Sequence, residues 1–239
     1  MGGGPDSEGA PLRAAHNGLV TPVSARLEWE IAAQRVIPVL RCSEVSDAVD
    51  TARACARSGM RVIELTRSIP RVSRAIERLR GDGLIVGLGT VTSPEQIPPA
   101  VQAGASFVVS FCAPDRFVKA AHDHDIVAIP GAMTPSEVHA CLGVGADAVK
   151  IFPAAQMAPT YIRDLKAVMP SARLMVTGGI GIEAEALRRW LAAGAWAVGL
   201  GNALGTVADV GAAEVERRAR LVLHLTGSET QDPPARRDE

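Results

Sequence analysis

Short apolar runs alternate with amphipathic stretches along most of this chain. The runs are rich in Val, Ile and Leu, and each is followed by an Ala/Arg/Glu-rich segment with helical spacing and then by a glycine-centred turn. Gly59, Gly104, Gly145 and Gly194 stand late in the helical segments or just after them, where a left-handed C-cap is needed. The runs predict eight strands, at residues 36–40, 61–65, 84–88, 107–110, 126–129, 148–151, 173–176 and 196–200.

Eight alternations of buried strand and helix predict an α/β fold, a single closed parallel (β/α)8 TIM barrel. The segment at 23–35 predicts an extra N-terminal helix that plugs the N-terminal face of the barrel. An open doubly wound sheet is the alternative, but no Gly-x-Gly-x-x-Gly turn follows the first strand. We expect the barrel to span 23–226, between a disordered leader at 1–22 and a disordered tail at 227–239.

The composition fits a globular protein with a large core, since 47% of the 239 residues are hydrophobic and 21% are charged. A formal net charge of −1 provides no overall field to recruit nucleic acid or an anionic membrane, and 3% aromatic residues argue against base stacking. No apolar run approaches the length of a membrane span. We therefore expect neither nucleic acid nor membrane as a partner.

The four cysteines are widely spaced, with no Cys-x-x-Cys pair, and the first residues lack the basic and apolar regions of a signal peptide. This pattern fits a reducing compartment better than a disulfide framework or a structural zinc site. We therefore expect a cytoplasmic protein.

One lysine, Lys150, stands inside an apolar run, AVKIF at 148–152, whereas Lys119 and Lys166 stand in polar, helix-like segments. A buried ammonium is costly unless it is paired or neutral, and a neutral amine at a strand end is the nucleophile that Schiff-base chemistry needs. The alternative is a lysine that reaches water from the end of the strand or pairs with a carboxylate.

Glu64 is a second charged residue inside an apolar run, VIEL at 62–65. It can be interpreted as the partner in a salt bridge that neutralises Lys150 or Arg41, or as a general acid and base whose pKa rises towards neutrality in a low dielectric. The two interpretations overlap, because a close lysine–glutamate pair couples its titrations.

Two glycine-rich segments, TGGI at 177–180 and GLGN at 199–202, end the seventh and eighth predicted strands, and we expect the second to open the final helix. Backbone N–H groups without side chains can approach an anion closely, and a helix N-terminus favours negative charge. Either segment alone fits an ordinary turn, but barrels commonly bind phosphate between these two loops. Together the segments predict a phosphate site.

Other polar groups are interpreted as structural. His122 and His124 have an i, i+2 spacing on a predicted helix, which indicates solvated surface, and Cys112 is interpreted as a packed thiol. No ligand set with zinc or magnesium spacing follows the strands. We expect no metal and no cofactor.

Five segments form longer motifs along the chain: VKIFPA at 149–154, IELT at 63–66, GLGTV at 87–91, PGAMTPSE at 130–137 and TGGI at 177–180. With these motifs the chain resembles the class I aldolase family of 2-keto-3-deoxy-6-phosphogluconate (KDPG) aldolase and 4-hydroxy-2-oxoglutarate (KHG) aldolase, over about residues 30–205. The resemblance implies a homotrimer, a Schiff-base mechanism and no metal.

The resemblance also implies roles for individual residues. Lys150 would attack the ketone of a 2-keto-3-deoxy (phospho)sugar acid and Glu64 would move protons, so that the small-molecule partners are a keto acid and a (phospho)aldehyde. Thr90, with Arg41 or Arg67, would hold the substrate carboxylate. The remaining expected substrate-binding residues, chiefly at the distal phosphate, are Thr177, Gly178, Gly179, Gly201 and Asn202.

Three positions depart from the family pattern. Ser68 stands where the family usually has arginine, with Arg67 one position early; Ser110-Phe111-Cys112 replaces a frequent Ser-Pro-Gly; and Asn202 replaces a frequent serine. Two other functions therefore stay open. One is an aldolase or decarboxylase for unphosphorylated 4-hydroxy-2-oxo acids, and the other is a non-catalytic barrel that binds a phosphorylated ligand.

Overall fold

The computed structural model describes residues 22–227. Of the predicted leader it includes only Pro22, and of the predicted tail only Gly227; the rest of both segments lies outside the described residues. Pro22 already belongs to the first helix. The proposed domain boundaries remain a prediction.

The described residues form one sheet of parallel strands in the order β5-β4-β3-β2-β1-β9-β8-β7-β6. The strands are β1 Val36–Leu40, β2 Val62–Thr66, β3 Ile85–Gly89, β4 Phe107–Val109, β5 Val127–Ile129, β6 Gly131–Ala132, β7 Val149–Ile151, β8 Leu174–Thr177 and β9 Ala197–Leu200. All eight predicted strands are present, with ends that shift by one residue at most.

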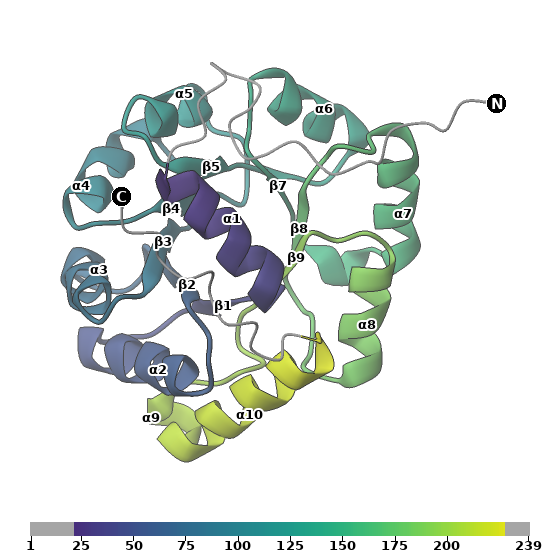
Figure 1. Ribbon diagram of the computed structural model, residues 1–239. Coiled ribbons are helices and arrows are strands. Elements are labelled where there is room, and N and C mark those ends of the chain that lie inside the picture. The colour runs from purple at the N-terminus through teal and green to yellow at the C-terminus, as the bar shows by residue number, and fades with distance from the viewer. Residues whose placement is uncertain (1–21, 228–239) are drawn as a thin grey trace, which may run out of the picture.

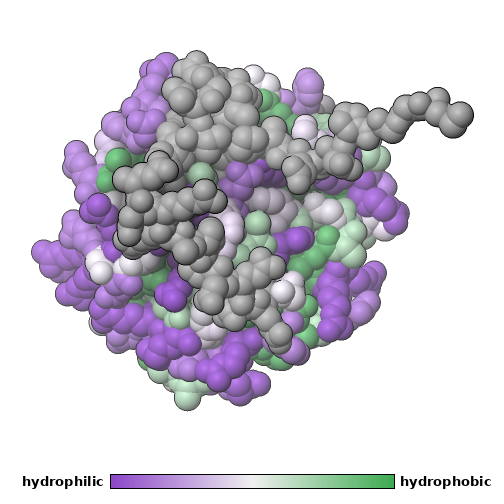
Figure 2. All heavy atoms as spheres, in the orientation of Figure 1, coloured by the Kyte–Doolittle hydropathy of each residue, from purple (hydrophilic) through white to green (hydrophobic). Residues whose placement is uncertain are grey.

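Helices follow the strands and form a ring around them (Figure 1). The helices of the ring are α2 Val45–Arg57, α3 Val72–Gly81, α4 Ile97–Gln102, α5 Phe117–His122, α6 Pro135–Gly143, α7 Pro159–Val168, α8 Ala184–Ala192, α9 Val207–Val210 and α10 Ala212–Leu225, and a further helix, α1 Pro22–Gln34, precedes β1. Hydrophilic residues dominate the outer rim of the face seen in Figure 2.

The ring of strands closes at Pro130, which separates β5, the fifth predicted strand, from the short strand β6 that the sequence did not predict. Proline has no N–H to donate, but its carbonyl still accepts a bond from Lys150 N–H at 2.8 Å. On the other side, Ser110 N–H donates to Ile129 O at 3.0 Å and Gly131 N–H donates to Cys112 O at 2.8 Å. The interrupted strand therefore joins β4 to β7 and completes the predicted TIM barrel.

Helix α1 crosses the N-terminal end of the barrel, as the sequence predicts (Figure 1). Its Leu27 and Ile31 are fully buried in one cluster with the side chains that fill the barrel interior. The barrel residues of this cluster are Ile37, Val39, Val62, Ile85, Phe107, Val109, Val127, Ile129, Ala148, Met175 and Ala197. The helix thus seals the N-terminal end of the barrel interior and leaves the C-terminal ends of the strands for chemistry.

Candidate active site

The candidate catalytic residues continue the inward-facing series of the barrel strands. Side chains alternate along a strand, so a residue two positions beyond an interior residue also faces the interior. Glu64 is two residues beyond Val62, and Lys150 is two residues beyond Ala148, both of which belong to the interior cluster. The fold therefore brings the two residues together near the C-terminal ends of β2 and β7.

Lys150 Nζ lies 3.6 Å from Glu64 Oε1, within ion-pair range but beyond hydrogen-bonding distance. The Lys150 side chain is 7% exposed and the Glu64 side chain is 0% exposed. Neither carboxyl oxygen of Glu64 has a hydrogen-bond partner within residues 22–227. Buried polar atoms normally have a hydrogen-bond partner, so these two oxygens are unusual. They are available to accept hydrogen bonds from a bound substrate or water.

Burial raises the pKa of Glu64, while the positive charges of Lys150 and Arg41 act in the opposite direction. The net direction is upward, because loss of hydration is the largest of these effects. A carboxyl group with a raised pKa can both accept and donate a proton closer to neutral pH. The position of Glu64 therefore suits acid and base catalysis beside an amine.

Glycines on the inner faces of neighbouring strands leave room for these side chains. A Cβ on Gly89 would lie 1.9 Å from Glu64 Oε1, and a Cβ on Gly199 would lie 2.3 Å from Thr177 Oγ1. The carboxyl and the hydroxyl thus occupy space that another residue would fill. Thr177 is 5% exposed, and its hydroxyl oxygen has no hydrogen-bond partner in the described chain.

The residues expected at the substrate carboxylate do not share one environment. Thr90 is half-buried directly after β3 and has φ of 64°, which costs a β-branched residue about 1–3 kcal/mol. Arg41 follows β1, is exposed, and lies close enough to Glu64 to lower its pKa. Arg67 is also exposed, and its backbone N–H donates to Gly89 O at 2.9 Å. Their contacts with a substrate remain predictions.

The two predicted phosphate loops do follow adjacent strands, β8 and β9. Gly178 and Gly179 have φ of 102° and 74°, a conformation that favours glycine. Gly201 is half-buried and Asn202 is exposed. The expectation that this second loop opens the final helix is wrong, because Gly205 N–H closes a turn onto Asn202 O and the last helices begin only at Val207 and Ala212.

Phe152 is a neighbour of the pair that sequence reasoning did not select. Its ring centroid lies 5.7 Å from Lys150 Nζ, within cation–π range. The ring of Phe111, which is 44% exposed, lies 6.5 Å away from the Phe152 ring. Period-two alternation could have found Phe152, which is two positions beyond Lys150. The same alternation places Phe111, named above as part of a departure from the family pattern, two positions beyond the interior residue Val109.

The interpretation of His122 as solvated surface is wrong. Its Nε2 lies 2.8 Å from Asp147 Oδ2, and the two side chains are only 14% and 1% exposed. The same carboxylate oxygen accepts the N–H of Ala128 at 2.8 Å. His124 is exposed, as expected. The histidine therefore ties α5 to the start of β7 rather than facing water.

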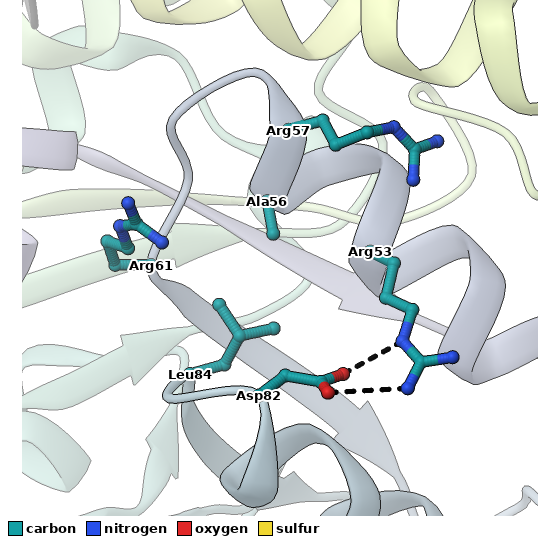
Figure 3. A pocket seen from close by; sticks show the side chains of 6 residues that line it. All are labelled: Arg53, Ala56, Arg57, Arg61, Asp82 and Leu84. Atoms are coloured by element: carbon teal, nitrogen blue, oxygen red, sulfur yellow. Dashed lines mark hydrogen bonds and ion pairs between the residues drawn. The ribbon is translucent and has the colours of Figure 1, made fainter.

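A hollow beside the N-terminal ends of β2 and β3 is lined by Arg53, Ala56, Arg57, Arg61, Asp82 and Leu84 (Figure 3). Arg53 and Asp82 make two hydrogen bonds there, at 2.8 and 3.3 Å, and Arg57 pairs with Glu216 at 2.9 Å. Arg53, Asp82 and Arg57 therefore serve surface ion pairs between elements, at the end of the strands opposite to Lys150.

Within the described residues, no cluster of three or more His, Cys, Asp or Glu side chains is arranged to hold a metal ion. No helix between residues 22 and 227 is long and apolar enough to cross a membrane.

A closed α/β barrel with a buried lysine and carboxyl group near its C-terminal mouth has the architecture of a Schiff-base lyase. The family model described as KDPG and KHG aldolase matches residues 27–221. The chain therefore belongs to the KDPG and KHG aldolase family, and it is a class I aldolase.

Similar proteins agree with this assignment. The chain is 31% identical to the 2-dehydro-3-deoxy-6-phosphogalactonate aldolase of Escherichia coli K12 over 71% of this chain and 83% of the relative. It is 36% identical to the 2-dehydro-3-deoxy-phosphogluconate aldolase of Treponema pallidum over 61% of this chain and 71% of the relative. The solved KDPG aldolase of Legionella pneumophila, with pyruvate captured as a covalent carbinolamine, is 30% identical, with a TM-score of 0.69 over 83% of this chain and 95% of that one.

Proposed function

We propose that this protein cleaves a 2-keto-3-deoxy-6-phospho sugar acid, such as KDPG, to pyruvate and a phosphorylated aldehyde. The observation that supports this proposal most directly is the buried pair of Lys150 and Glu64, with Nζ and Oε1 3.6 Å apart. The relatives that act on KDPG or its galactonate epimer support the substrate class.

Lys150 acts as the nucleophile. Its unprotonated Nζ attacks the C2 carbonyl, and Glu64 supplies the proton with which the carbinolamine loses water to form an iminium ion. The C4 hydroxyl then gives its proton to the Glu64 carboxylate as the C3–C4 bond breaks. The bonding electrons move to the iminium and leave an enamine while the aldehyde departs. Protonation at C3 and addition of water at C2 release pyruvate and restore the amine.

The remaining site residues hold the two ends of the substrate. Thr90 and Arg41 or Arg67 bind the carboxylate, because a guanidinium fork can donate two parallel bonds to it. The distal phosphate rests on the loops after β8 and β9. There the residues are Thr177, Gly178, Gly179, Gly201 and Asn202, and the free hydroxyl of Thr177 supports this role.

A Lys150→Arg variant tests the nucleophile. Borohydride reduction in the presence of pyruvate should add a reduced pyruvyl group to Lys150 of the unaltered protein, seen by peptide mass spectrometry, and none to the variant. Lys119→Arg is the matched control, since Lys119 is exposed and pairs with Asp123 on the outside of α5. Retained turnover in Lys150→Arg would exclude the mechanism.

The phosphate loops favour a second candidate, cleavage or decarboxylation of an unphosphorylated 4-hydroxy-2-oxo acid. Residues 177–183 and 199–206 contain no lysine or arginine, so a phosphate there depends mainly on backbone N–H and hydroxyl donors. The one guanidinium recorded against these loops in the described chain, that of Arg218, donates to Ala203 O at 3.4 Å and pairs with Glu214. The ratio of kcat/KM for substrates with and without the terminal phosphate decides between the two. A strong preference for the phosphorylated substrate supports the first proposal, and no preference supports the second.

We further infer a homotrimer in the cytoplasm. The family resemblance supports the trimer, and light scattering after size exclusion should give three times the 25.0 kDa of one chain. Four free cysteines, three of them buried, support a reducing compartment, which cell fractionation tests.

A further inference from the structure

Phe111, two residues beyond the end of β4, is a large apolar side chain that remains 44% exposed. Phe107 and Val109 of β4 both belong to the interior cluster, so the alternation places Phe111 on the same inward series, one step nearer the mouth. Phe111 therefore faces the site rather than the outer helices.

The backbone around Phe111 is fixed by bonds on both sides. Ser110 N–H donates to Ile129 O at 3.0 Å, and Gly131 N–H donates to Cys112 O at 2.8 Å. Cys112 N–H also donates to the hydroxyl of the fully buried Ser110 at 3.2 Å. The ring is therefore carried by a short segment that is tied to the barrel wall.

Gly131 brings this segment close to Lys150. A Cβ on Gly131 would lie 2.2 Å from the carbonyl carbon of Phe111, so the two backbones touch. Gly131 is in turn the register partner of Lys150. The Phe111 ring lies 6.5 Å from the ring of Phe152, which itself lies 5.7 Å from Lys150 Nζ. The two rings form one apolar surface that starts beside the amine at Phe152 and extends to Phe111, and we call it the aromatic wall (Phe111 and Phe152).

The order of the strands decides which part of the substrate meets this wall. The phosphate loops follow β8 and β9, on one side of β7, whereas Phe111 follows β4, on the other side. Thr90, expected at the carboxylate, follows the adjacent strand β3. A substrate joined to Lys150 through C2, with C1 at Thr90 and C4 to C6 directed towards the phosphate loops, crosses the mouth of the barrel and presents one side of its C2–C3 segment to β4 and Phe111.

We propose that Phe111 is a specificity-determining residue that limits the size of the 2-oxo acid half of the substrate. This inference rests on the proposed function. A ring fixed beside C3 leaves room for the methyl group of pyruvate and disfavours a longer donor such as 2-oxobutanoate. One methylene in an apolar pocket changes kcat/KM by about 10- to 200-fold.

The experiment measures kcat/KM in the aldol direction for pyruvate and for 2-oxobutanoate, with glyceraldehyde 3-phosphate as the acceptor. We expect the unaltered enzyme to prefer pyruvate, and Phe111→Ala to reduce that preference about 10-fold or more, because the wall has been removed. Phe111→Leu should shift the preference in the same direction by less. Val168→Ala removes an exposed apolar side chain at the end of α7, outside the site, and should leave the preference unchanged.

Borohydride trapping of pyruvate on Lys150 separates the ways in which the experiment can fail. If the unaltered enzyme forms no adduct, the proposed function is wrong. If the enzyme and its Phe111→Leu and Phe111→Ala variants form the adduct but share one preference ratio, only the role of Phe111 is wrong. If Phe111→Ala does not fold, the ratio measured for Phe111→Leu decides, and an unchanged ratio there overturns the inference.

Discussion

Gly89 and Glu64 are fitted to each other across neighbouring strands. A Cβ on Gly89 would lie 1.9 Å from Glu64 Oε1 and 2.6 Å from Glu64 Cδ. Glu64 is completely buried, and such a Cβ would displace its carboxyl group from its present position. The position of the carboxyl relative to Lys150 therefore depends on a residue that carries no chemistry of its own.

Gly89→Ala should lower kcat about 100-fold, because a displacement of 1 Å in a catalytic group costs about that much. Steady-state kinetics on KDPG measures the effect, and circular dichroism establishes that the barrel is retained. Gly81→Ala is the matched control, since a Cβ on Gly81, at the end of α3, meets nothing within 4 Å. Unaltered turnover in Gly89→Ala would show that the carboxyl need not lie where the structure has it.

The pH dependence of kcat/KM should report the raised pKa of Glu64. Protonation of its carboxylate removes the base, so activity should fall with decreasing pH already above the ordinary glutamate value of about 4.3. Arg41 lowers the pKa of Glu64, so Arg41→Ala should raise it and move the acidic limb to higher pH. Arg67→Ala is the comparison, because Arg67 is not among the charges that shift this pKa. A limb that stays in place in Arg41→Ala contradicts the assignment of this limb to Glu64.

Gln34 fastens α1 to the first two strands. Its buried side-chain amide donates to Val36 O at 2.6 Å and Val62 O at 2.8 Å, and its carbonyl oxygen accepts the N–H groups of Arg61 and Val62 at 2.6 and 3.0 Å. Loss of an amide that joins three elements leaves buried polar groups without partners, each of which costs about 1–3 kcal/mol.

Gln34→Ala should therefore lower the free energy of unfolding by about 3 kcal/mol. Urea titration followed by circular dichroism measures the change. Gln102→Ala, at the exposed end of α4, is the control for removing a glutamine side chain and should have a small effect. Equal effects from the two variants would show that the buried amide does not hold α1 in place.

The strands and the Lys150–Glu64 pair could be predicted because their signals are local. Each strand is a short apolar run, and a charged residue inside such a run is visible without knowledge of its neighbours. The location of an active site at the C-terminal ends of the barrel strands then follows from the fold class. The pairing of Lys150 with Glu64, 86 positions apart in the sequence, followed from that rule and not from their spacing.

What could not be predicted depends on contacts between distant segments. His122 resembles a surface residue on its own helix, but its partner Asp147 lies 25 residues further on. Pro130 marks the end of a strand by local rules, yet the neighbouring strands continue the hydrogen bonding through Gly131. The contact between Gly89 and Glu64 likewise appears only when β2 and β3 are placed side by side.

Glu137 closes a capping box at the start of α6 and should make stability depend on pH. Its Oε2 accepts the N–H groups of Met133 and Thr134, both at 2.8 Å, and these bonds lower the pKa of Glu137. A lowered pKa means that the stabilisation is complete above the unfolded value of about 4.3 and is lost as pH falls through the lower folded value. The decrease in melting temperature caused by Glu137→Ala should therefore be largest at neutral pH and become smaller in strong acid.

Differential scanning calorimetry over this pH range measures the decrease in melting temperature. Glu77→Ala, on the exposed face of α3, is the control for removing a surface glutamate. A loss that is the same at every pH would show that the charge of Glu137 does not stabilise the helix.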